Sequence, residues 1–319
     1  MTTSSGTATP EPSQPVGSQP VGSPCDLPRS SHSRSAQSGS AQSGSALSHS
    51  ARPPSAPADS LPARSTRARS FDAAAARYAA HRPSYPPALL DALEELAGRP
   101  LAGTRVADIG AGTGLATALL HARGADVIAV EPGDGMAAQF RRTLPDVPIV
   151  RGTGDALPLA DDTVDVLTYA QSWHWTDPSR SVPEALRVLR PGGTLALWWN
   201  TAALDVPWIA EQAERLGRHF GRDATEELRR LGPSSADPGG RLGLVRRQVR
   251  WSRRVPVDTH LANLGTHSAF LIHDETRNTA FFAEERDRLL ARFPDGAVEE
   301  TYEVVLLTAV DPGAHPHTA

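Results

Sequence analysis

Hydrophobic positions recur at two different spacings along the chain, starting near residue 71. Between residues 87 and 97 four leucines recur at helical spacing and predict an amphipathic helix: Leu89, Leu90, Leu93 and Leu96. The preceding segment FDAAAARYAAHR (71–82) also looks helical. We expect it to end before Pro83, because the residue that precedes a proline disfavours the helical conformation.

Short apolar runs then alternate with helical segments. The runs that read as strands are TRVADIG, ADVIAVE, VPIV, VDVLTYA and TLALWW (104–110, 125–131, 147–150, 164–170 and 194–199). Strands that alternate with helices imply right-handed crossovers and a parallel sheet covered on both faces. We therefore expect the α/β class, with a doubly wound, Rossmann-like, seven-stranded and mostly parallel sheet.

The C-terminal third predicts an antiparallel edge strand and a helical lid. An amphipathic helix is expected over 207–220, a Gly/Pro/Ser-rich loop over 231–243, a strand over 244–255, a helix over 275–293 and a last strand over 301–310. The last two strands are expected to pair antiparallel at one edge of the sheet. The material between them would then lie over the carboxyl ends of the strands, where open α/β sheets bind ligands. One domain over 70–319 results, with lid or substrate insertions within 200–300.

Composition separates the N-terminal 69 residues from the rest. Residues 1–69 are dominated by Ser, Pro, Gly, Ala and Gln, and such a stretch cannot bury enough apolar surface to offset the entropy of ordering it. We expect a disordered tail. The single cysteine, Cys25, lies in it, so no disulfide can form within one chain.

Charge and hydropathy limit the partners. The formal net charge of −4 gives no basic footprint for nucleic acid. No apolar run approaches the length of a membrane helix, and no secretory leader is evident. We expect a cytoplasmic monomer or homodimer that acts on a small molecule and needs no metal.

The segment VADIGAGTG (106–114) runs from an apolar strand into glycines at Gly110, Gly112 and Gly114, with Ala111 between the first two. Glycines let the backbone turn sharply and let a ligand approach closely, and the helix behind them offers free N–H groups. A dinucleotide fingerprint would place its third glycine at Leu115, one residue later. Asp108 would repel a pyrophosphate but suits an ammonium group. A structural turn and a dinucleotide site stay open, and S-adenosylmethionine is favoured.

Acidic residues follow later strands. Glu131 ends the second strand, where a carboxylate can accept hydrogen bonds from both hydroxyls of a ribose. Met136 lies just beyond and could cover an adenine or pack in the core. Asp155 precedes the fourth strand, where it could accept from an adenine amine while the Ala156 N–H donates to a ring nitrogen. A turn-capping Asp is the alternative.

These blocks together resemble the class I S-adenosylmethionine-dependent methyltransferases over nearly all of residues 71–310. Four segments carry the resemblance: DIGAGTG from Asp108, VEP at Glu131, GDA at Asp155, and LRVLRPGGTL from Leu186, where PGG is expected as a turn. The nearest likeness is to the small-molecule branch with trans-aconitate and ubiquinone or menaquinone methyltransferases. The entry segment FDAAAARYAAHRPSYP looks like that branch's cofactor-covering helix.

The resemblance implies a set of cofactor contacts. Tyr78 and Arg82 would approach the methionine end of S-adenosylmethionine. The remaining contacts would be Asp108, Gly110, Ala111, Gly112, Gly114, Glu131, Met136, Asp155, Ala156 and Gln171.

The methyl group would point toward the segment YAQSWHW (169–175). Alignment can supply much of the rate of an in-line methyl transfer, and a base is needed only for a protonated nucleophile. His174 is the candidate base, although a histidine between two tryptophans can simply pack. The acceptor would be a carboxylate, hydroxyl or activated carbon, and a lid region with His267 and Ser268 would select it. The alternatives are a methyltransferase-fold binding protein without turnover and an NAD(P)-dependent oxidoreductase; a nucleic-acid methyltransferase is disfavoured by the acidic balance.

Overall fold

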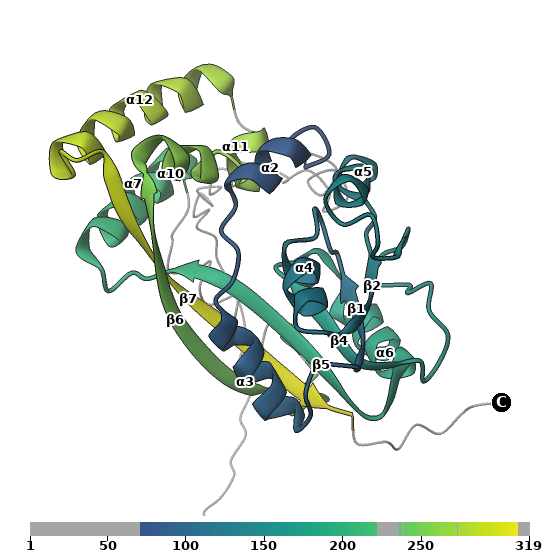
Figure 1. The fold of residues 1–319 in the computed structure, drawn as a ribbon. Coiled ribbons are helices and arrows are strands. Elements are labelled where there is room, and N and C mark those ends of the chain that lie inside the picture. Colours follow the sequence, from purple (N-terminus) through teal and green to yellow (C-terminus); the bar gives the residue numbers. More distant parts are fainter. Residues whose placement is uncertain (1–70, 222–235, 238, 273, 312–319) are drawn as a thin grey trace, which may run out of the picture. The chain divides into compact units, whose positions relative to one another are not determined.

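The computed structural model describes residues 71–221, 236–237, 239–272 and 274–311, all within one compact unit, Pro57–Ala319 (Figure 1). The tail expected to be disordered, 1–69, lies outside the described residues. So does part of the Gly/Pro/Ser-rich loop that was expected over 231–243.

A seven-stranded sheet with strand order β3-β2-β1-β4-β5-β7-β6 forms the centre of the fold. Its strands are β1 (Arg105–Ile109), β2 (Asp126–Val130), β3 (Ile149–Val150), β4 (Val164–Ala170), β5 (Leu189–Ala202), β6 (Val245–Pro256) and β7 (Ala297–Val310). The first five strands pair parallel, and β7 pairs antiparallel with both β5 and β6. The predicted α/β class with a mostly parallel sheet and an antiparallel edge strand is confirmed.

The helices are α2 (Ala75–His81), α3 (Pro87–Ala97), α4 (Leu115–Ala122), α5 (Asp134–Thr143), α6 (Pro178–Val188), α7 (Pro207–Phe220), α10 (Val257–Leu264), α11 (Ser268–Ile272) and α12 (Glu275–Arg292), with a 3₁₀ turn, η1 (Trp173–Trp175). Helices α3 and α7 have the predicted limits. The first helix begins later than its alanines suggest, at Ala75. No side chain caps α2 at its start, and the nearby acid, Asp72, instead accepts hydrogen bonds from the first turn of α5.

The structure differs from the sequence-based expectation at the PGG segment (191–193), which was expected as a turn before the fifth strand. β5 already begins at Leu189 and includes Pro191 to Gly193, and its register against β4 shifts between Val164 and Val166. Gly192 has φ +75°. The segment is therefore an irregularity within a long strand, and glycine supplies the left-handed backbone that it needs.

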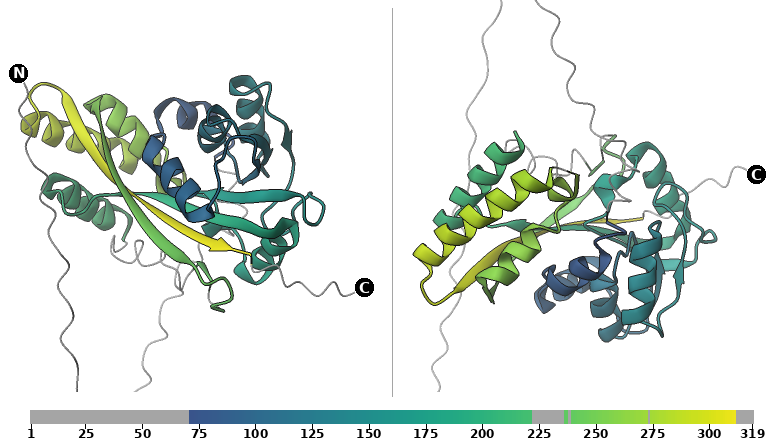
Figure 2. Two further views of the ribbon diagram at one scale, coloured as in Figure 1. Left: turned by 60° about the horizontal axis from the view of Figure 1, so that its bottom comes forward. Right: turned by 90° about the horizontal axis from the view of Figure 1, so that it is seen from above.

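Each face of the sheet packs against its own apolar cluster. On one face, side chains such as Leu93 of α3, Leu120 of α4 and Phe140 of α5 pack with Val106 of β1. On the other, Val182 of α6 packs with the neighbouring residue of β1, Ala107. Successive residues of one strand are thus buried on opposite faces, as expected for a parallel sheet with helices on both sides (Figure 2).

A third cluster belongs to the lid. It joins Trp208 of α7, Leu261 of α10, Leu289 of α12 and Val298 of β7. The last parallel pair of β4 and β5 is Ala170 with Trp198, whereas β5 and β7 stay paired as far as Ala202 and Tyr302. The antiparallel strands therefore extend past the carboxyl end of β4 and carry the lid helices there (Figure 1).

No helix in the described ranges is both long enough and apolar enough to cross a membrane.

Candidate functional site

The glycine loop after β1 depends on backbone conformations that favour glycine. Gly110, Gly112 and Gly114 have φ of +66°, +59° and +92°. A Cβ atom on Gly110 would lie 2.5 Å from Cβ of Ser172, so the segment after β4 packs directly on the loop. A Cβ atom on Gly112 would meet only the Gly110 carbonyl oxygen, at 4.0 Å. The backbone at Gly112 is therefore open to a ligand, while Gly110 is fixed by packing.

Glu131 connects this loop to the end of β2. Its side chain is buried, Oε2 accepts a hydrogen bond from the Gly112 N–H (2.8 Å), and Oε1 accepts one from the Gly133 N–H (2.6 Å). Burial raises the pKa of Glu131, and the two backbone hydrogen bonds oppose that rise. Each carboxylate oxygen has a second lone pair, so two acceptor positions remain for the hydroxyls of a ribose.

Asp108 is fully buried, and its two oxygens accept hydrogen bonds from the hydroxyls of Thr117 (2.6 Å) and Thr168 (2.9 Å). Burial raises the pKa of Asp108, and these hydrogen bonds oppose the rise. The carboxylate thus joins β1 to α4 and β4 at the base of the loop. A contact with a ligand ammonium group stays a prediction.

The predicted adenine contacts lie in the loop between β3 and β4. Asp155 is half-buried and accepts a hydrogen bond from the Asp177 N–H (2.8 Å). The Ala156 N–H donates to the Thr153 carbonyl (3.3 Å), so the predicted donor to a ring nitrogen takes part in a local turn. Met136 is buried on α5. Their roles toward an adenine remain predictions.

The entry segment before α2 lies against the start of α5. Asp72 Oδ1 accepts hydrogen bonds from the N–H groups of Gly135 (2.9 Å) and Met136 (3.2 Å), and a Cβ atom on Gly135 would overlap the Asp72 carbonyl oxygen. Phe71 packs edge-on against Tyr78 and Trp175, each with ring centroids 5.9 Å apart. The segment thus connects α2, α5 and the turn after β4. Sequence reasoning missed Asp72, because its partners on α5 are 63 and 64 residues away and its place in the sequence suggests a cap for α2 instead.

Arg82 follows α2 directly. Its guanidinium carbon lies 5.0 Å from the centroid of the Tyr78 ring, and Nη1 lies 3.4 Å from Nε2 of His267. His267 is exposed, yet the surrounding protein atoms displace part of its water, and together with the positive charge of Arg82 this lowers the pKa of its imidazole well below the usual value. Within the described part of the chain, Arg82 forms no ion pair and its buried Nε atom lacks a hydrogen-bond partner. This guanidinium can therefore donate hydrogen bonds to an anionic group.

Tyr85 is a further residue that sequence reasoning did not single out. It is buried and packs edge-on against Trp198 of β5, with ring centroids 5.9 Å apart. Burial raises the pKa of its hydroxyl, and the nearby Tyr78 and Asp108 raise it further. Tyr85 therefore lies where the entry segment meets the carboxyl ends of β1 and β5. Its place in the RPSYP motif is the signal that could have found it.

The turn after β4 holds the candidate base. Gln171 has φ +58°, and its N–H donates to the Trp198 carbonyl (2.8 Å). His174 on η1 is exposed, and its Nδ1 accepts a hydrogen bond from the indole N–H of Trp199 (3.1 Å). A neutral imidazole has one free lone pair on its ring nitrogens, and here that pair is occupied. The hydrogen bond from Trp199 counts against a base role, which stays a prediction.

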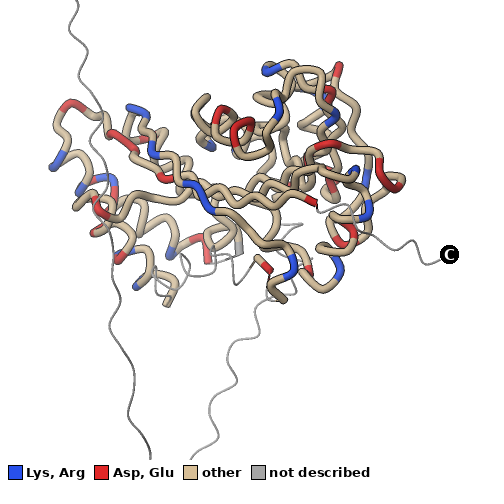
Figure 3. Tube along the Cα trace, turned by 90° about the horizontal axis from the view of Figure 1, so that it is seen from below, with Lys and Arg blue, Asp and Glu red and all other residues tan. Residues whose placement is uncertain are grey.

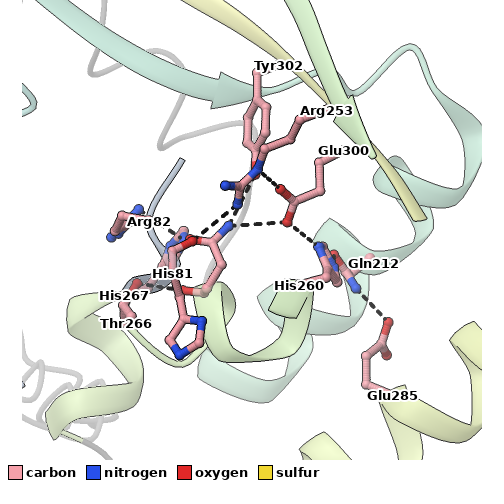
Figure 4. Close-up of polar contacts among 11 residues, drawn as sticks. His81, Arg82, Gln212, Arg253, His260, Thr266, His267, Glu285, Glu300 and Tyr302 are labelled. Atoms are coloured by element: carbon pink, nitrogen blue, oxygen red, sulfur yellow. Dashed lines mark hydrogen bonds and ion pairs between the residues drawn. The ribbon is translucent and has the colours of Figure 1, made fainter. Parts of the chain in front are cut away.

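A buried polar network runs through the lid. Glu300 of β7 accepts from Arg253 Nε through Oε2 (2.5 Å) and is bonded to His260 Nδ1 through Oε1 (2.7 Å). His260 Nε2 is bonded to Oε1 of Gln212 (3.0 Å), and Gln212 Nε2 donates to Glu285 (3.0 Å). Strands β6 and β7 are thereby linked to helices α10, α7 and α12 (Figure 4).

The ionised side chain of Glu300 is expected to stabilise the folded protein, so stability should depend on pH in the range where this group titrates. Burial opposes its ionisation, but the hydrogen bonds and charges of His260 and Arg253 outweigh burial and lower the pKa of Glu300 from 4.5 to about 2. Because the folded state depresses the pKa, the stabilisation is complete above pH 4.5 and is lost as the pH falls toward 2. We expect the Tm of the wild-type protein to fall over this acid range more steeply than that of Glu300→Gln. Equal slopes for the two proteins would contradict the assignment.

The family model and the two relatives described here are all methyltransferases. A family model described as a methyltransferase domain matches residues 107–197. An uncharacterised methyltransferase from Mycobacterium tuberculosis (strain ATCC 25618 / H37Rv) is 46% identical over 148 residues, which cover 46% of this chain and 59% of that protein. A demethylmenaquinone methyltransferase from Beutenbergia cavernae is 39% identical over 106 residues, 33% of this chain and 43% of the relative. The chain therefore spans only part of the length of these relatives.

A solved structure extends the likeness to most of the fold. It is that of a proposed type II methyltransferase from Anaeromyxobacter dehalogenans, with 25% identity and a TM-score of 0.55, and it covers 72% of this chain and 98% of that chain. The matched domain, the sheet and the glycine loop bonded to the acid of the second strand show that the chain contains a methyltransferase domain with the fold of the class I S-adenosylmethionine-dependent methyltransferases.

Proposed function

We propose that the protein transfers a methyl group from S-adenosylmethionine to a small-molecule acceptor. The observation that supports this most is the position of Glu131, whose carboxylate is bonded to the backbone of the glycine loop beside the open face of Gly112. A ligand at Gly112 would lie within reach of that carboxylate, as an adenosine ribose requires.

The remaining residues fit the two ends of this cofactor. Arg82, which forms no ion pair among the described residues, would bind the carboxylate of the methionine end, with Tyr78 beside it. Asp155 would accept from the adenine amine with the oxygen lone pairs that the Asp177 N–H leaves free. The cofactor supplies a methyl group on a positively charged sulfur. The protein's part is to hold this group in line with the acceptor and to exclude water.

The acceptor would carry a carboxylate, a hydroxyl or an activated carbon. The matched demethylmenaquinone methyltransferase is named for a quinone, which supports the activated carbon among the three. Arginines on β6 are paired with acids, Arg247 with Glu95 and Arg250 with Asp205, and the two signs of charge are interspersed over the described elements (Figure 3). This interspersion favours a small molecule over a nucleic acid.

An NAD(P)-dependent oxidoreductase is the rival enzyme class. The position of its third glycine is held by Leu115, the first residue of α4. Calorimetric titration with S-adenosylmethionine, S-adenosylhomocysteine, NAD and NADP separates the two. Binding of NAD or NADP in place of the first two would refute the proposal, and binding of the first two without transfer to any acceptor would indicate a binding protein.

A further inference from the structure

In the lid network, the ionised state of Glu285 determines which groups donate hydrogen bonds and which accept them. Burial disfavours the charge of Glu285, but hydrogen bonds from Arg215 and Gln212 outweigh burial and lower its pKa. The ionised Glu285 can only accept, so Gln212 must direct its Nε2 donor to Glu285 and its Oε1 acceptor to His260.

His260 must then donate through Nε2 to Gln212. Its Nδ1 is bonded to Oε1 of Glu300, so both ring nitrogens are engaged. His260 is buried among Glu300, Gln212 and the ring of Trp208.

The other oxygen of Glu300 fixes Arg253, which links the network to the entry segment. Arg253 Nε donates to Glu300 (2.5 Å), and Nη2 of the same guanidinium donates to the carbonyl of His81 (3.2 Å), the last residue of α2 (Figure 4). A cation beside the final carbonyls of a helix is favourable, because these groups have no partner within the helix. Arg253 therefore binds the C-terminal end of α2.

Helix α2 needs such support. It has 7 residues and no side-chain cap at its start, and helices this short are marginal on their own in water. Its start is connected to α5 through Asp72, and its end is bonded to Arg253. Tyr78 lies on α2 and Arg82 follows it, so these two attachments contribute to the position of both, beside the packing of α2 on α10.

We propose that Arg253, held by Glu300, is a positioning residue that anchors α2 and thereby sets the affinity for the methionine end of the cofactor. The inference rests on the proposed function for the identity of the ligand. The anchoring itself does not, because it concerns contacts within the chain. Arg253 would touch neither cofactor nor acceptor.

The test compares Arg253→Met and Arg253→Lys with Arg247→Met in the full chain. Methionine removes both hydrogen bonds, whereas lysine keeps the charge beside Glu300 but lacks the fork that reaches two acceptors. Arg247 lies on the same strand and the same face of β6, and it pairs with Glu95 on α3 instead of α2. Two readouts are used: amide hydrogen exchange of residues 75–82, and the Kd for S-adenosylhomocysteine by calorimetry.

We expect Arg253→Met to speed exchange in α2 and to raise the Kd by at least about tenfold, with a smaller rise for Arg253→Lys and none for Arg247→Met. Where an acceptor is known, KM for S-adenosylmethionine should rise while kcat changes little. Unchanged exchange of α2 in the two Arg253 variants would overturn the anchoring, and if Arg253→Met proves too unstable to measure, Arg253→Lys decides alone. Faster exchange with an unchanged Kd would overturn the coupling to the cofactor. A wild-type protein that binds neither cofactor form would refute the proposed function, whereas exchange would still decide the anchoring.

Discussion

Glu131→Ala is expected to weaken S-adenosylmethionine binding by at least about tenfold. The substitution removes the two acceptor positions proposed for the ribose, and hydrogen bonds to a charged group contribute about 1.5–3 kcal/mol each. It also leaves the N–H groups of Gly112 and Gly133 without their partner, so the loop itself should loosen. Calorimetric titration of the variant measures the loss.

The matched control is Asp126→Ala, at the opposite end of the same strand, where the acid is exposed and 3.9 Å from Arg105. This variant should bind the cofactor as the wild type does. Thermal unfolding of both variants separates lost affinity from lost structure. Wild-type affinity in folded Glu131→Ala would remove Glu131 from the cofactor site.

Gly110→Ala is expected to destabilise the domain and to abolish cofactor binding. The left-handed backbone at φ +66° costs a non-glycine residue about 1–2 kcal/mol, and overlap with Cβ of Ser172 at 2.5 Å adds about 1–3 kcal/mol of overpacking. Denaturant unfolding measures the sum.

Gly103→Ala measures the loss of stability that comes from backbone strain alone, without steric overlap. Gly103 has φ +72°, and a Cβ atom there would meet nothing within 4 Å, so only the conformational strain applies. Adding Ser172→Gly to Gly110→Ala should recover part of the lost stability, because it removes the overlapping Cβ atom. If Gly110→Ala were no less stable than Gly103→Ala, the close packing of the two loops would be contradicted.

Local patterns were sufficient to predict most of the sheet and several helices. The leucines of α3 and the apolar alternation of β1, β2 and β4 record burial directly, because a parallel sheet buries both faces of its strands. The PGG segment was misjudged for a local reason. Glycine and proline mark a departure from regular backbone, and the same residues serve a turn or an irregularity within a strand.

The site was predictable where its residues follow strand ends and less so where contacts are long-range. The motif located Asp108 but not its two threonine partners, Thr117 and Thr168, which determine what its oxygens do. The link from Arg253 to His81 joins residues far apart in the sequence, and neither carries a motif. Such pairs follow from the topology of the antiparallel strands and cannot be found from spacing alone.

The most direct test of the proposed S-adenosylmethionine site is calorimetric titration of the wild-type protein with S-adenosylmethionine and S-adenosylhomocysteine, with NAD as the control. We expect saturable binding of the first two at one site per chain and no binding of NAD. Binding of NAD alone, or of none of the three, would contradict it.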